Sequence, residues 1–118
     1  MDEKIRLINK ATTRAELKAI AAEQFGDMVK AVVDVERGLM AVGGEMHADE
    51  EAFLLDQESK QEHLWGINLY PESFDAQFIE FDSMINIRPR QNNRSRSVES
   101  METREQIIKV VKNLVQDI

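Results

Sequence analysis

The sequence predicts a small α+β domain with a mainly antiparallel sheet of about four to five strands, packed by two to three helices. Apolar residues recur at every second position in some stretches and at helical spacing in others, which indicates both strands and helices. These stretches do not follow the regular alternation of strand and helix that a parallel sheet requires. The chain has 118 residues, the common size of one domain, so we expect residues 1–118 to fold as a single domain.

Each expected element rests on a local pattern. In chain order, these elements are a short edge strand around residues 5–8, a helix over 14–25, strands over 28–36 and 39–42, a helix over 46–57, strands over 64–70 and 77–88, and a helix from about residue 101. Thr13 and Glu16 have the spacing of a capping box, which predicts the start of the first helix. Gly26 follows the last turn of that helix, where a positive φ costs least. Ser100 is the expected cap of the last helix.

Two of the expected strands show clear alternation. In residues 28–36, apolar residues on one face alternate with Lys30 and Asp34 on the other, which predicts a half-buried strand. In residues 77–88, apolar residues keep one parity and polar residues keep the other without interruption, which predicts one long strand. A tight turn at Asp82–Ser83, which would give two short strands, is the alternative.

Charge and composition narrow the classes of function. The formal charge of −7 argues against nucleic acid or an anionic membrane as the partner of the whole surface. The chain has no cysteine, which excludes disulfides, thiolate nucleophiles and cysteine-based metal sites. The start at Met1–Lys4 lacks the features of a signal peptide, and no run reaches the ~18 apolar residues that a membrane span needs. We therefore expect a cytoplasmic protein without membrane contact, and no pattern calls for a cofactor.

Several blocks of the sequence resemble a catalogued family of small prokaryotic domains of unknown function. These blocks are Asp27–Glu36, Ala41–Asp49, Trp65–Pro71 (WGINLYP), Phe78–Pro89 (FIEFDSMINIRP) and the later Asn93–Arg96. The resemblance spans nearly the whole chain. It implies a free-standing domain, and it implies no activity, cofactor or partner.

The segment from Arg88 to Arg96 is out of character for an acidic chain. It contains four arginines and no acid, with Asn and Ser between them. Guanidinium groups form planar forks that fit phosphate or carboxylate, so the leading hypothesis is a non-enzymatic binding module for an anionic ligand. A phosphate-bearing small molecule or an acidic protein partner would suit it. The expected ligand-binding residues are Arg88, Arg90, Asn93, Arg94, Arg96, Glu80, Asp82 and Asn86.

Two observations qualify this hypothesis. The segment contains no aromatic residue on which unpaired bases could stack, which argues against nucleic acid as the ligand. A solvated loop, whose arginines pair with the surrounding excess of Asp and Glu, would show the same composition.

The alternative function is a small metal-assisted or acid–base enzyme that acts on a phosphate ester. It requires the carboxylates and imidazole of Glu45, His47, Asp49, Glu80 and Asp82 to meet across the sheet. Their spacing fits no established metal signature, and no phosphate-binding glycine loop, dinucleotide fingerprint or nucleophile elbow occurs. A third alternative is an oligomerisation domain, such as a homodimer, that pairs through an exposed sheet edge.

Overall fold

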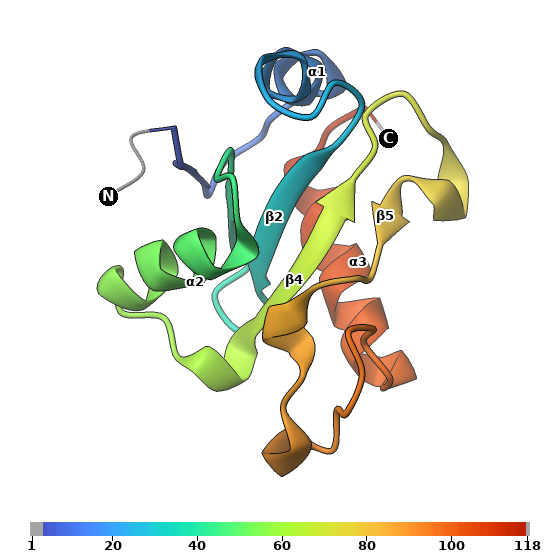
Figure 1. Cartoon of the computed structure of the whole chain (residues 1–118). Coiled ribbons are helices and arrows are strands. Elements are labelled where there is room, and N and C mark those ends of the chain that lie inside the picture. Colours follow the sequence, from blue (N-terminus) through green and yellow to red (C-terminus); the bar gives the residue numbers. More distant parts are fainter. Residues whose placement is uncertain (1–3, 118) are drawn as a thin grey trace.

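The computed structural model describes residues 4–117, which form a five-stranded antiparallel sheet and three α-helices (Figure 1). In chain order, the elements are β1 (Arg6–Ile8), α1 (Arg14–Glu23), β2 (Val29–Asp34), β3 (Leu39–Val42), α2 (His47–Asp56), β4 (Leu64–Leu69), β5 (Ile79–Glu80) and α3 (Met101–Leu114). The strands are ordered β1-β3-β2-β4-β5. The predicted fold class is confirmed. No helix in the described range is long and apolar enough to cross a membrane.

Side-chain caps fix the predicted helix starts. The hydroxyl of Thr13 accepts a hydrogen bond from the backbone N–H of Glu16 at 3.2 Å, and Ser100 caps α3 in the same way. The Glu16 carboxylate instead accepts from the hydroxyl of Thr12 at 2.6 Å, so only half of the expected capping box forms. Gly26 has a φ of 90°, as its place after α1 requires.

Helices cover both faces of the sheet. The helices α1 and α3 pack on one face, and α2 packs on the other; α3 lies behind the sheet in Figure 1. The larger core, under α1 and α3, includes Leu17, Ile20, Val29, Ala31, Val33, Met40, Val42, Trp65, Ile67, Leu69, Ile107, Val111 and Leu114. The smaller core, under α2, consists of Val32, Leu39, Ala41, Leu54 and Leu64.

The strand β2 is therefore buried on both sides, and the prediction of a half-buried strand is wrong. Asp34 is fully buried, and its carboxylate accepts hydrogen bonds from the backbone N–H groups of Glu36 and Arg37, each at 2.9 Å, and from the Ser59 hydroxyl at 2.7 Å. These bonds replace the water that the carboxylate loses. Asp34, a polar residue of the alternating pattern, is thus buried with its carboxylate fully hydrogen-bonded.

The predicted long strand over residues 77–88 is also wrong, because only Ile79–Glu80 pairs with β4. The chain then leaves the sheet and forms a 3₁₀ turn over Met84–Asn86. The side-chain amide of Asn86 donates to the carbonyl of Gly66 at 2.9 Å and accepts from its N–H at 2.8 Å. A side chain therefore replaces the backbone of the missing strand beside β4.

Candidate functional site

Arg88 directs its guanidinium onto the protein itself. The guanidinium donates to the carbonyl oxygens of Gln61 and Leu64, and its central carbon lies 4.1 Å from the centroid of the Trp65 ring. Burial lowers the pKa of Arg88, and the charge of Glu51 on α2 opposes that effect. These contacts attach the first residue of the arginine-rich segment to the start of β4.

Asn86 and Asn93 are both buried and hold the backbone of the same segment. Asn93 donates from Nδ2 to the carbonyl oxygens of Asn86 and Ser97, each at 2.7 Å, and its Oδ1 accepts from the N–H of Glu99 at 2.8 Å. Because these bonds use both ends of the amide, Asn93 shapes the loop that presents the arginines.

Arg90 and Arg94 have exposed side chains. The backbone N–H groups of Arg94 and Ser95 donate to one carboxylate oxygen of Glu99, at 2.9 and 2.8 Å. Hydrogen bonds from Ser95 and from the backbone of Arg94 lower the pKa of Glu99. Successive N–H groups that converge in this way form an anion-binding concavity, and here a carboxylate of the same chain occupies it. An external anion would therefore meet the guanidinium groups alone.

Arg96 forms an ion pair with Asp82, with 2.6 Å between Nε and Oδ1. The two side chains are 55% and 42% exposed, so solvent screens the pair. The backbone carbonyl of Arg96 also accepts from the N–H of Ser83 at 3.0 Å. The structure thus brings Arg96 beside the chain that follows β5.

Glu80 lies in a different polar cluster, on β4 and β5. Its Oε1 accepts from the amide of Asn68 at 2.8 Å and from the hydroxyl of Tyr70 at 3.0 Å. Burial and the Glu80 carboxylate raise the pKa of Tyr70. Glu80 and Asp82 therefore each have a separate partner.

His47 begins α2 and is buried against the sheet, where its Nε2 lies 2.8 Å from the carbonyl oxygen of Ile67. Burial lowers the pKa of His47, and the charge of Lys30 acts in the same direction. The neutral ring then donates from Nε2 to the carbonyl. Glu45 and Asp49 are exposed, and among residues 4–117 no group of three His, Asp or Glu side chains is placed to hold a metal ion.

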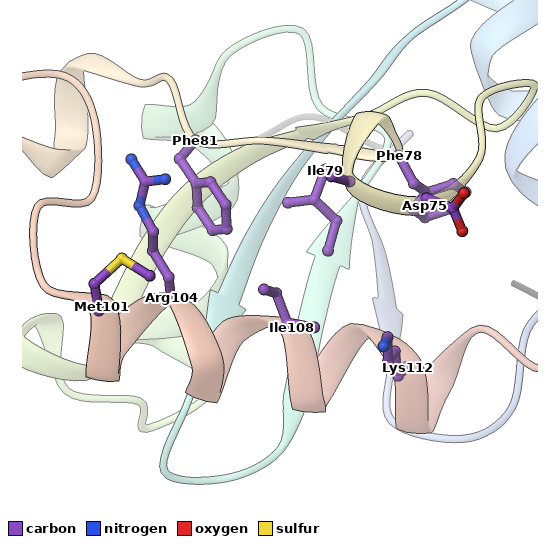
Figure 2. Close-up of a pocket in the computed structure, with 9 residues that line it drawn as sticks. Asp75, Phe78, Ile79, Phe81, Met101, Arg104, Ile108 and Lys112 are labelled. Atoms are coloured by element: carbon purple, nitrogen blue, oxygen red, sulfur yellow. The ribbon is translucent and has the colours of Figure 1, made fainter.

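A groove lies between β5 and α3 (Figure 2). Its volume is about 650 Å³, which lies within the range of roughly 300–1,000 Å³ that ligand pockets occupy. Its apolar lining comes from Phe78, Ile79 and Phe81 on one side and from Met101 and Ile108 on the other. In Figure 2, Ile79 and Phe81 point from the strand toward α3.

Charged side chains border this groove, which we call the β5–α3 groove. Arg104 stacks on Phe81, with 4.7 Å between Cζ and the ring centroid, and it donates from Nε to the carbonyl of Val98 and from Nη2 to Ser97. Its Nη1 bonds to no described residue. Lys112 and Asp75 lie at the opposite end (Figure 2).

The β5–α3 groove adjoins the arginine-rich segment. Arg104 bonds to Ser97 and Val98, which directly follow Arg96, and Asp82, the partner of Arg96, directly follows Phe81. The Phe81 end of the groove is therefore the cationic end.

Sequence reasoning missed the groove residues of α3. A signal was present, because Met101, Arg104, Ile108 and Lys112 recur at steps of three or four residues and form one helix face beside the buried stripe. Met101, the first residue of this face, is 68% exposed.

A protein family matches most of the chain. Residues 6–114 match the model of a family described as "Protein of unknown function (DUF5674)". This match confirms the predicted resemblance to a family of small domains of unknown function. No curated protein and no solved structure matches the chain.

Proposed function

We propose a function for this chain, which belongs to this family of proteins of unknown function. The family carries no assigned activity, so the proposal rests on the geometry of the structure. The protein is a non-enzymatic binding module that holds an acidic, partly apolar partner in the β5–α3 groove. The apolar part of the partner lies between β5 and α3, and its acidic group lies at the end that Arg104 and Arg96 flank.

The observation that carries this proposal is the combination of an apolar groove with a cationic end. The lining includes Arg104 and Lys112 against one acid, Asp75, on a chain whose net charge is −7. A local reversal of charge favours acidic partners and speeds their approach. The aromatic ring of Phe81 supplies apolar contact area at low cost in side-chain entropy.

The predicted ligand-binding residues take different roles in this proposal. Arg94 and Arg96 extend the cationic end of the groove, and Asp82 orients Arg96 through the ion pair. Arg88, Asn86 and Asn93 hold the segment in place. Arg90 and Glu80 contribute to the surface around the site, without a contact to the groove.

A pair of dyes tests the proposal. 8-Anilinonaphthalene-1-sulfonate has apolar rings and a permanent negative charge, and N-phenyl-1-naphthylamine has the same rings without the charge. We expect Ile108→Gln to weaken binding of both dyes by about fivefold, since it removes about 1 kcal/mol of apolar contact. Arg96→Gln should weaken only the charged dye, by roughly two- to fivefold at low salt.

Lys109→Gln is the matched control, because Lys109 is an exposed lysine on α3 outside the groove lining and the change in charge is the same. It should leave both affinities unchanged. Thermal unfolding of each variant shows that the fold is retained. Equal affinity of the charged dye for the native protein and for Ile108→Gln would overturn the proposal.

A further inference from the structure

We propose that the partner of the β5–α3 groove is an extended acidic peptide segment, which adds to β5 as an additional strand. This inference rests on the proposed function of the same groove, and it names the class of the partner. Addition of a strand to an open sheet edge is a general mode of peptide recognition, in which main-chain hydrogen bonds supply affinity and alternate side chains supply specificity.

The first observation is the open edge of β5. This strand ends the sheet, so its outer edge pairs with no strand among the described residues. The N–H of Tyr70 donates to the carbonyl of Phe78 at 2.9 Å, and Glu80 pairs with Asn68 in the same ladder. Because backbone groups alternate in direction along a strand, Ile79 points its N–H and C=O away from β4.

The chain itself forms one hydrogen bond along the continuation of this edge, at Ser83, two residues beyond Phe81. Ser83 has the same parity as Ile79 and Phe81, and its N–H donates to the backbone carbonyl of Arg96 at 3.0 Å. The arginine-rich segment therefore occupies the end of the edge and leaves Ile79 and Phe81 for an incoming strand. Such a strand would end directly beside Arg96.

The second observation is the direction of the side chains. Ile79 and Phe81 point toward α3 and form one wall of the groove, with Ile108 on the facing helix (Figure 2). Side chains of paired residues in neighbouring strands project to the same face of a sheet. Every second side chain of an added strand would therefore enter the groove, and apolar residues at those positions would pack against Ile108.

The third observation is the charge at the end of the groove. Arg104 keeps Nη1 without a hydrogen bond to any described residue, and it bonds to Ser97 and Val98, which directly follow Arg96 in the chain. Acidic residues at one end of the peptide would meet these guanidinium groups.

Methylated peptides test this inference with the native protein. The probe is a fluorescein-labelled peptide of about eight residues, in which Val or Ile alternates with Thr and the last two residues are Glu. Two analogues carry N-methyl groups at either the odd or the even backbone nitrogens. Only one of these sets can point toward β5, so we expect one analogue to bind at least about tenfold more weakly and the other to bind like the parent. Fluorescence anisotropy measures the three affinities.

Amide hydrogen exchange of the protein gives a second readout. Bound parent peptide should slow exchange at Ile79 and Phe81, and the charged naphthalene dye should leave exchange at these amides unchanged. Equal binding of all three peptides, with no slowing at Ile79, would overturn strand addition and leave the groove as a binding site.

The remaining outcomes separate the two proposals. Binding of the dye without binding of the peptide would overturn the peptide class alone, and binding of neither would also contradict the proposed function. A doubled mass by light scattering, with the same amides protected in the free protein, would assign the edge to a second copy and overturn the inference.

Discussion

Asn86 completes the hydrogen bonding of Gly66 in β4 with its side-chain amide, at 2.8 Å for the N–H and 2.9 Å for the carbonyl. A Cβ on Gly66 would lie 2.5 Å from the Cβ of Ser83, so this close approach depends on glycine. The pair fixes the point at which the chain leaves the sheet. It therefore also limits the length of β5.

Asn86→Ala should lower the free energy of unfolding by about 2–4 kcal/mol, because it leaves a buried N–H and a buried carbonyl of Gly66 without partners. Urea denaturation measures the loss. Asn113→Ala, at an exposed position of α3, is the control and should change stability by less than about 0.5 kcal/mol. Equal stability of the two variants would contradict the role of Asn86.

Gly66→Ala should be destabilising by a different mechanism. The added methyl group would collide with Ser83, and the backbone of the 3₁₀ turn would have to move away from β4. We expect a loss of about 1–3 kcal/mol, the usual cost of a forced shift in a packed region. Gly38→Ala is the comparison without a steric collision, because nothing lies within 4 Å of its Cβ position. Its φ of 68° still adds backbone strain. A neutral Gly66→Ala in urea denaturation would contradict the close approach.

The arginines should separate into structural and surface residues. Arg88→Ala removes the bonds to Gln61 and Leu64 and the stacking on Trp65, so we expect a loss of about 1–3 kcal/mol. Arg94→Ala should leave thermal stability nearly unchanged, because its side chain is exposed and in no ion pair with the described residues. Differential scanning calorimetry distinguishes the two. The opposite order of melting temperatures would contradict the assignment of Arg88.

His47 should make stability fall with decreasing pH. Burial lowers its pKa in the folded protein below the ordinary value of 6.5, so the unfolded chain binds a proton first as the pH drops. The stabilising contribution is complete above pH 6.5 and is lost as the pH falls toward the lowered folded pKa. Urea denaturation between pH 7 and 5 should show this loss.

Two variants isolate the effect of His47. His47→Gln should flatten the dependence in that range of pH, and His63→Gln should retain it. A dependence that survives His47→Gln would assign the pH effect to other groups.

Short-range patterns predicted most of the fold. The expected strand over 39–42, the cap at Ser100 and the positive φ of Gly26 depend on neighbouring residues, and these predictions are confirmed. The strand over 77–88 could not be predicted, because its end depends on a contact between Gly66 and Asn86, twenty residues apart. Polar residues at alternate positions of this segment are typical of an exposed strand face. Asn86 is one of these residues, but its side chain forms buried hydrogen bonds to Gly66.

The candidate site was less accessible to sequence reasoning for a related reason. The composition of the arginine-rich segment was plain, but the direction of each guanidinium depends on distant partners, such as Trp65 for Arg88 and Asp82 for Arg96. The β5–α3 groove has no local motif, since β5 and α3 form it from separate parts of the chain. Only the helix face through Ile108 gave a sign of it.

A map of chemical shifts in ¹H–¹⁵N spectra, recorded while 8-anilinonaphthalene-1-sulfonate is added, tests the binding role of the β5–α3 groove most directly. We predict that the largest changes fall on residues 75–81 and 101–112, with smaller changes at Arg96. Changes centred on residues 89–95, or on His47 and Asn68, would contradict it.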